Sequence, residues 1–540
     1  MSLHFSLRFH GICRFAARAK LAILLVLAVV VTAQGQNPSE AAGATTGKGS
    51  ILLVLPFDNR TGQPSLEWIR EAAPALLSSR FASAGFAPMS RADRLYALDH
   101  LGLPQGFQPT RASSIKLAQT LDADWIVVGN YINDGPAIIA EARIVDVTHM
   151  TMGNPVTTRG EMHDLIAVFD SLAWKLTRQL NPAFNVSQET FVAAGANLSL
   201  EAFEQYIRGI TESDQPERLR HLQQAVKLSP GFGPAWMALG REDYQGQQYE
   251  QAAAAFAKVG SDDPDALEAG FYRGLSLMFS GNYVQAEVAF ARVARVLPLA
   301  EVLNNQGVAI SRQGHDGTAM FRQASGADPG AVDYHFNLAV SLKRHGNGPE
   351  ALAELNQSLK LRPNDSEAQS LLAAWRQPGT TNVDPLERIE RTFDDEAFHQ
   401  AAVMLDQMEA TRLAALSPQE RARTLSSQAR DYLSRGLLLE SERLYQAAVA
   451  ADNTSEEAHA GLAEVRERTG DAAGARKEAQ AALELKPSAT AYLVLARLDF
   501  AASHLSDASH AATEALKLNP NSVAAQDLLR QVAAKQGQPQ

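Results

Sequence analysis

The sequence predicts a multidomain protein, in which a small α/β domain is followed by an all-α solenoid of stacked helical hairpins in two arrays. In residues 51–182, short apolar runs ended by Asp, Asn or Gly alternate with segments of helical periodicity. In residues 240–298, five residue types recur at a spacing of 34, the period of a two-helix repeat that buries its apolar face by stacking on its neighbours. Alanine-rich segments after residue 200 favour helix, because alanine loses no side-chain entropy there.

The composition is that of an ordinary globular protein. The chain has 540 residues, of which 46% are hydrophobic and 20% are charged. A chain of this length has room for roughly two to four domains.

The first 33 residues have the layout of a secretory signal peptide. Four basic side chains precede an uninterrupted apolar run at residues 21–31, and small residues end it at Ala33. We therefore expect cleavage after Ala33 and a periplasmic or secreted protein with no stable membrane span. The alternative is an uncleaved segment that anchors the protein in the inner membrane, although the apolar run is short for a bilayer.

Cysteine content and charge argue against thiol chemistry and against nucleic acid as a partner. The single cysteine, Cys13, lies before the apolar run, so the mature chain would have no disulfide, thiol nucleophile or thiolate metal site. Loss of residues 1–33 removes four basic and no acidic side chains, which takes the formal charge from −11 to −15. This acidic balance argues against nucleic acid as a partner and against binding anionic lipid through bulk charge.

Residues 34–50 are rich in Gly, Ala, Thr and Ser, which predicts a flexible linker. The α/β domain follows at residues 51–182. The turn Asn133-Asp134-Gly135 is expected to join two of its strands in a hairpin. Strands are expected at residues 51–57, 86–89, 124–132, 136–147 and 150–159, and helices at residues 66–84, 91–101, 112–121 and 163–180.

This domain resembles the amino-terminal domain of TolB. The resemblance is carried by the strand LVLPFDN, the helix after it, and a later segment in which Leu121, Ala123 and Gly129 precede or end a strand. It implies a non-catalytic domain that makes protein contacts, and no catalytic residue carries over.

The helical part resembles tetratricopeptide repeats. Gly240, Tyr249, Ala252, Phe256 and Pro264 recur as Gly274, Tyr283, Ala286, Phe290 and Pro298. The glycine and the alanine allow the two helices of a hairpin to approach closely, the phenylalanine fills the gap between hairpins, and the proline stops the second helix. The first array is expected at residues 200–376, with a shortened unit around Gly307 and Phe321 and a covering helix at residues 366–375.

A second array is expected near the carboxy terminus. Residues 377–385 break the periodicity and predict a linker. Residues 386–536 are expected to hold a less regular helical pair, at residues 386–416, and then hairpins in which Gly436 and Gly470 are 34 residues apart. A final covering helix is expected at residues 523–534.

The resemblance also implies which residues face a partner, because the first helix of each hairpin lines the concave face in that family. Apolar side chains beside basic and amide groups would suit an extended or helical peptide with an acidic end. The alternative is that the apolar ones pack against the next hairpin. Asn305 and Asn337 occupy one position of a carboxylate clamp, but the clamp's lysine is absent. The candidate groove residues are Met237, Arg241, Tyr244, Phe271, Leu275, Met278, Phe279, Asn304, Arg312, Phe336, Lys343 and Arg344.

Enzyme, cofactor and metal motifs are not expected. Residues 113–116 match S-x-x-K, but no S-D-N or K-T-G completes the site. The Gly-rich residues 43–50 are too short for a phosphate loop and precede a strand instead of following one. None of the 13 histidines falls in H-x-x-x-H or H-E-x-x-H spacing.

Two functions remain open. The favoured one is an exported, non-enzymatic interaction scaffold of the bacterial cell envelope that binds one or more proteins or peptides through the repeats. The other is a ligand-sensing or regulatory module whose α/β domain binds a small molecule. Partner, process and oligomeric state stay open.

Overall fold

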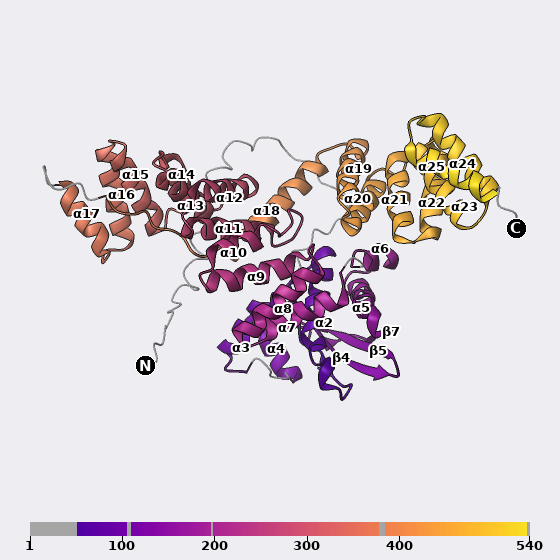
Figure 1. Ribbon diagram of the computed structural model, residues 1–540, viewed down its shortest axis with the longest axis horizontal. Coiled ribbons are helices and arrows are strands. Elements are labelled where there is room, and N and C mark those ends of the chain that lie inside the picture. The colour runs from indigo at the N-terminus through magenta and orange to yellow at the C-terminus, as the bar shows by residue number, and fades with distance from the viewer. Residues whose placement is uncertain (1–50, 105–109, 196–197, 377–383, 537–540) are drawn as a thin grey trace. The chain divides into compact units, whose positions relative to one another are not determined.

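The computed structural model describes residues 51–104, 110–195, 198–376 and 384–536 (Figure 1). They form two compact units. One contains Gly231–Leu405, and the other contains the described residues up to Pro230 together with those from Asp406 onward. The expected signal peptide (1–33) and linker (34–50), and residues 377–383, lie outside the described residues.

The α/β domain is a mixed sheet with its longest strands in one hairpin. β4 and β5 pair antiparallel from Trp125 with Asp146 to Asp134 with Ala137, so the turn is Gly135-Pro136 and the expected Asn133 and Asp134 belong to the strand. β1 pairs in parallel with β3 and β4, and β5 pairs antiparallel with β6 and β7. The strands are β1 (Ile51–Val54), β2 (Asp58–Asn59), β3 (Ala87–Pro88), β4 (Trp125–Asp134), β5 (Ala137–Asp146), β6 (Thr151–Met152) and β7 (Val156–Glu161).

Helices cover both faces of this sheet. On one face, Leu53, Ile126 and Val145 pack with side chains of α3 and α4. On the other face, α5 lies on β5 and β7, and Phe169 meets Phe57 with ring centroids 5.7 Å apart. The helices are α2 (Ile69–Ser83), α3 (Arg91–His100), α4 (Arg111–Thr120), α5 (Leu165–Leu180) and α6 (Gln188–Ala193). The expected order of strands and helices is present, with the last strand divided into β6 and β7.

The unit Gly231–Leu405 is a stack of helical hairpins. A Cβ added at Gly240, Gly274 or Gly307 would lie 2.7, 2.5 or 2.8 Å from the phenylalanine ring of the second helix. The third distance matches the others although that unit is shortened, because the second helix itself is shorter: α14 begins at Thr318, only three residues before Phe321, whereas α12 begins at Tyr283, seven residues before Phe290. The helices are α9 (Gly233–Gln245), α10 (Tyr249–Phe256), α11 (Ala266–Phe279), α12 (Tyr283–Val296), α13 (Ala300–Arg312), α14 (Thr318–Ala327), α15 (Val332–Arg344), α16 (Gly348–Leu361) and α17 (Ser366–Arg376).

The second unit combines the α/β domain with further hairpins. The hairpin of α7 and α8, expected in the first array, lies here, where Phe203 meets Trp68 at 6.5 Å. α6 packs on α20 and α21, and the Ser187 backbone N–H donates to the Glu442 carboxylate at 3.3 Å. The helices are α7 (Leu200–Thr211), α8 (Gln215–Leu228), α19 (Pro418–Ser434), α20 (Leu438–Ala451), α21 (Glu456–Thr469), α22 (Ala472–Leu485), α23 (Ala489–Ala501), α24 (Leu505–Leu518) and α25 (Val523–Gln536).

The helical pair expected at residues 386–416 is wrong in its first half. Only α18 (Asp395–Ala414) is helical there, and residues 384–394 form an extended segment. The segment is extended because its backbone bonds to side chains of the first array instead of to its own helix turns.

The close approach of the two helices of a hairpin can be tested at Gly274, with Gly326 as the control. Gly274→Ala places a methyl group 2.5 Å from the fully buried Phe290 ring, so it should lower the free energy of unfolding by about 1–3 kcal/mol. Gly326→Ala, at an exposed helical position with nothing within 4 Å, should raise it by up to about 1 kcal/mol. Calorimetry of the two variants would measure this, and equal shifts of the melting transition would contradict the packing role of Gly274.

Candidate peptide groove of the first array

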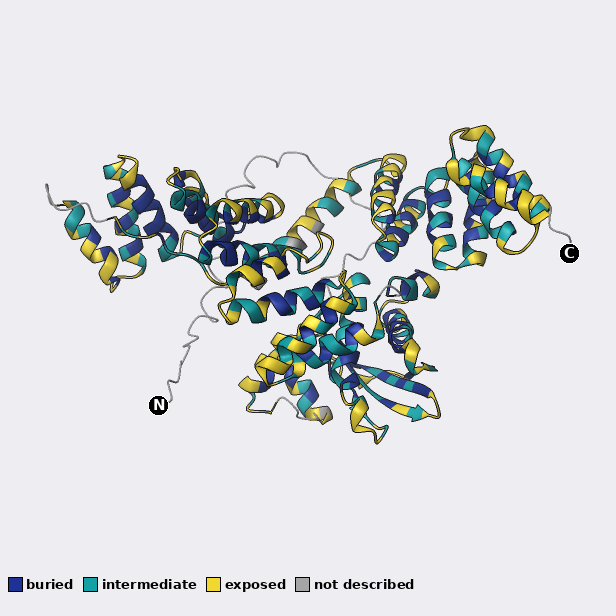
Figure 2. Ribbon diagram, in the orientation of Figure 1, coloured by how far each residue is buried: buried dark blue, intermediate teal, exposed yellow. Residues whose placement is uncertain are grey.

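Three first helices of the first array, α11, α13 and α15, are covered by another part of the chain. We call residues 384–394 the strap. Its hydrogen bonds and ring contacts reach α15 first, then α13, then α11, in reverse chain order. In α15, every residue from Tyr334 to Leu342 is buried, which an amphipathic helix with one free face would not show (Figure 2). The strap therefore occupies the groove that the first helices form.

Three asparagines bind the strap through its backbone. The Asn337 side chain accepts from the Arg388 N–H and donates to the Arg388 carbonyl, both at 2.7 Å. The Asn305 side chain makes the same two bonds to Glu390, at 2.9 and 2.7 Å. Asn304 donates to the Arg388 carbonyl at 3.1 Å and accepts from Asn337 at 2.8 Å. All three side chains are fully buried, and they replace the neighbouring strand that an extended segment normally needs.

The Arg388 side chain lies in an acidic pocket. Its guanidinium donates two bonds to Asp365, at 2.7 and 3.0 Å, and one each to Asp333 and Glu367, at 2.8 and 2.9 Å. It also lies 3.6 Å from the centroid of the Phe336 ring. Burial by itself lowers the pKa of Arg388, but the bonds to Asp365, Asp333 and Glu367 raise it above its usual value, so the cation is held firmly.

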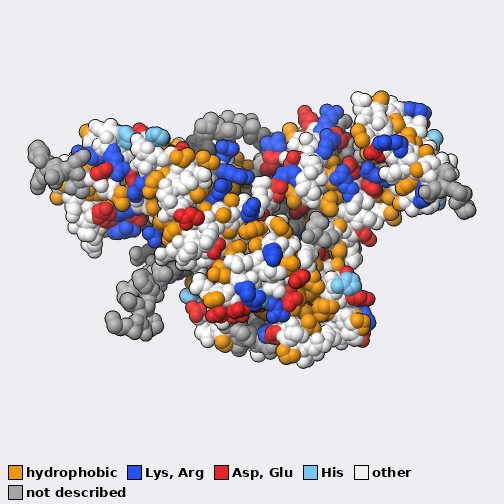
Figure 3. Space-filling model, in the orientation of Figure 1, with side chains coloured by type: hydrophobic (Ala, Val, Ile, Leu, Met, Phe, Trp, Pro, Cys, Tyr) orange, Lys and Arg blue, Asp and Glu red, His pale blue; other side chains and the backbone are white. Residues whose placement is uncertain are grey.

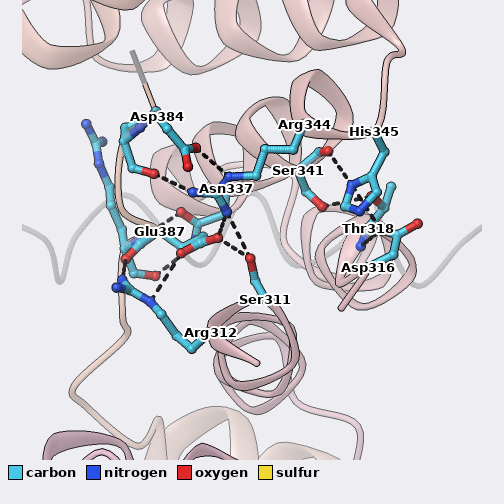
Figure 4. A network of polar contacts seen from close by, with 12 residues as sticks. Ser311, Arg312, Asp316, Thr318, Asn337, Ser341, Arg344, His345, Asp384 and Glu387 are labelled. Carbon is cyan, nitrogen blue, oxygen red and sulfur yellow. Dashed lines mark hydrogen bonds and ion pairs between the residues drawn. The ribbon is translucent and has the colours of Figure 1, made fainter. Parts of the chain in front are cut away.

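The Glu387 side chain lies in an adjacent basic pocket (Figure 4). It is 1% exposed and forms ion pairs with Arg344 and, at 3.3 Å, with Arg312. The Ser311 hydroxyl donates to the same carboxylate. Arg344 also donates to the Asp384 carboxylate at 2.5 Å and to the Pro385 carbonyl at 2.7 Å. Two pockets of opposite charge therefore lie side by side and fix the register of the strap.

Aromatic contacts hold the other end of the strap. Phe393 is 7% exposed, and its ring lies 5.5 Å from Phe271 of α11 and 5.7 Å from Phe398 of α18. The Arg391 guanidinium lies over the Phe279 ring at 5.2 Å. This end is bound mainly by apolar area and the other end mainly by charge.

The candidate groove residues fall into two groups. Contact with the strap is made by Phe271, Phe279, Asn304, Arg312, Phe336 and Arg344. The other six candidates make their contacts with other parts of the protein. Met237, Leu275 and Met278 pack in the hydrophobic core, and Tyr244 contacts other aromatic rings. Arg241 forms an ion pair with Glu268, and Lys343 lies over the Trp375 ring.

Several groove residues lie outside the candidate set. Asp333, Asp365 and Glu367 form the acidic pocket. Asp333 lies in α15 and the other two lie at the start of α17, and none of the three is at a position that the family resemblance assigns to the concave face. Ser311 and Asn305 also contact the strap. The available signal was the row of amides at 304, 305 and 337 inside otherwise apolar helices.

Metal sites and membrane spans are absent from the described residues. No group of three or more His, Cys, Asp or Glu side chains among them could hold a metal ion. In the part of the chain that the structure describes, no helix is both long and apolar enough to cross a bilayer.

Family models identify the hairpins. Residues 237–300 and 427–490 match one model described as tetratricopeptide repeat, and residues 312–374 match another with the same description. The chain therefore carries tetratricopeptide repeats in both arrays. The matched ranges lie outside residues 51–182, so the resemblance of that domain to TolB stays a prediction.

Solved structures share parts of the fold. YrrB, described as a tetratricopeptide repeat protein with an unusual peptide-binding site, is 16% identical, with a TM-score of 0.28 over 37% of this chain and 98% of its own. MamA from Desulfovibrio magneticus RS-1 is 20% identical, with a TM-score of 0.28 over 31% of this chain and 99% of its own. The LpoB carboxy-terminal domain from Escherichia coli is 22% identical, with a TM-score of 0.19 over 21% of this chain and 84% of its own. No curated protein matches the chain.

A buried carboxyl group beside the strap makes the free energy of unfolding depend on pH. The Asp394 N–H donates to Glu301 at 3.2 Å, and burial raises the pKa of Glu301 to about 7 from the usual 4.5, with the nearby Asp394 and Glu390 charges adding to the rise. The folded protein therefore keeps a proton on Glu301 that the unfolded chain loses above pH 4.5. The free energy of unfolding should fall as the pH rises from 4.5 to about 7, by at most about 3 kcal/mol.

Glu301→Gln should remove this pH dependence, because the amide carries no charge at either end of the range. Urea titrations of the two proteins at pH 5 and at pH 7.5 would measure it. The same pH slope in both would show that Glu301 is ionised in the folded protein.

Proposed function

We propose that this chain is an exported, non-enzymatic scaffold of the bacterial cell envelope that holds a partner protein through its tetratricopeptide repeats. The matched repeats support the interaction class, because stacked hairpins build extended concave surfaces that bind other chains. The signal-peptide layout of residues 1–33 supports export.

The observation that carries the proposal is the set of asparagine bonds to the strap. Asn305 and Asn337 each bind both polar groups of one residue's backbone, and the bound residues, 388 and 390, are two apart as in a strand. A groove with this chemistry binds an extended polypeptide, whose peptide groups need partners wherever they lie away from water.

Charge supports a protein partner over a polyanion. The chain is acidic, with a formal charge of −11, and basic and acidic side chains lie interspersed on the face drawn in Figure 3. Nucleic-acid binding normally needs a basic patch or stripe.

The proposal is tested by affinity capture from an envelope fraction with the full-length protein. We expect the protein to be in that fraction, with its amino terminus at Gln34, and to retain a partner. The double variant Asn305→Ala/Asn337→Ala should lose most of that partner, because its groove can no longer bind an extended backbone.

The control is Asn356→Ala. This asparagine is exposed and lies outside the groove contacts: it donates to Leu352 within α16 and accepts from the exposed Arg376 of α17, so capture should persist. Circular dichroism would establish that each variant keeps its helices. A protein found in the cytoplasm with its leader intact, or one that retains the same proteins with and without the groove asparagines, would contradict the proposal.

A further inference from the structure

We propose that the groove under the strap is an exchangeable site, and that the strap is its ligand in cis. The incoming ligand would be an extended segment of a partner protein that presents an acidic residue, an arginine directly after it, and an aromatic residue five positions beyond the arginine. This inference rests on the proposed function and specifies the partner segment.

The backbone contacts in the groove are independent of the strap's sequence. The hydrogen bonds of Asn305 and Asn337 to the strap go only to the peptide N–H and C=O groups of residues 390 and 388, so any extended segment with non-proline residues at these two places can replace the strap. When the strap leaves, water can satisfy the three asparagines. Exchange therefore leaves no polar group of the groove without a partner.

The side-chain contacts provide the selectivity. The arginine site is made by Asp365, Asp333 and Glu367, and the acid site next to it by Arg344 and Arg312. A segment with arginine and glutamate in the opposite order would place like charges together at both sites. The order of the two charges therefore selects the ligand and its direction.

The bonding of the strap is that of an interface more than that of a core. Glu387 and Arg388 bind one end of the strap through charge, and a single aromatic side chain, Phe393, binds the other end. Leu386, which directly precedes Glu387, is 65% exposed and adds little apolar contact. Interfaces that exchange partners combine one buried aromatic anchor with charged hydrogen bonds, and charged contacts weaken with salt.

A partner protein fits the site better than a second copy of this chain. The strap of a second copy offers the same contacts as the resident one but lacks the covalent connection, which gives the resident strap a high effective concentration. A segment of another protein can displace it by matching the two charged sites and the Phe271 contact more closely.

The test uses a fluorescent peptide of residues 384–394, DPLERIERTFD, and the full-length protein. Wild-type protein should bind the peptide weakly, because the apparent dissociation constant is the intrinsic one divided by the open fraction of groove. Arg388→Ala loosens the resident strap and should improve the apparent affinity for the peptide about tenfold or more. Leu386→Ala, which changes an exposed strap residue, should leave the wild-type value unchanged.

Two further measurements define the site. The peptide with residues 387 and 388 exchanged should not bind to the Arg388→Ala protein, and adding Asn305→Ala/Asn337→Ala to that protein should abolish binding of the normal peptide. Glu387→Gln, which keeps the shape of the strap, provides a second loosened protein if Arg388→Ala loses helix by circular dichroism.

The inference is overturned if neither loosened, folded protein gains affinity, or if the exchanged peptide binds equally well. A strap-dependent dimer of the wild-type protein by light scattering would assign the groove to a second copy and would also overturn it. If the groove asparagines are needed for affinity capture of a partner but the peptide does not bind, this inference alone is wrong. If capture does not depend on the groove asparagines, the proposed function is wrong.

Discussion

The groove depends on a contact between one glycine and one phenylalanine ring that recurs in the first three hairpins of the unit Gly231–Leu405. Gly240, Gly274 and Gly307 have no side chain, so the phenylalanine of the second helix lies directly against the first. This contact sets the distance between the helices and, repeated along the stack, keeps successive first helices in the same orientation. As a result Asn304 and Asn337, which are 33 residues apart, lie close enough to share a hydrogen bond of 2.8 Å and to bind the same strap carbonyl.

The buried charged groups of the strap are paired with opposite charge, which offsets the cost of removing them from water. The carboxylate of Glu387 and the guanidinium of Arg388 are both removed from most of the water around them, and each meets opposite charge in a planar, multiply bonded arrangement. The amides of Asn305 and Asn337 bond to the peptide groups that they cover. A purely apolar groove would hold a chain of any register, whereas this one holds the strap in a single register.

The sequence predicted most of the architecture because its signals are local and repeat. Period and residue type in the hairpins, and alternation and turn residues in the sheet, depend on neighbours along the chain. Within the groove, the positions implied by the resemblance to tetratricopeptide repeats include Asn304, Arg312, Phe336 and Arg344, which contact the strap.

The strap could not be predicted by the same means. Its backbone is satisfied by asparagines more than 50 residues away, and no local pattern reports such a partner. The charges of residues 387–391 are equally compatible with a solvated helix. The acidic pocket was missed for the same reason, because Asp365 and Glu367 acquire their role only when Arg388 folds back onto them.

The reverse path of the strap has a consequence for biosynthesis. The parts of the stack that contact the strap, namely α11, α13, α15 and the start of α17, all precede residue 384, so synthesis from the amino terminus produces them ahead of the segment that fills the groove. A nascent chain thus passes through an interval in which its receptor surface is finished and vacant. Under the proposed function, a partner that is present during that interval binds without first displacing the strap.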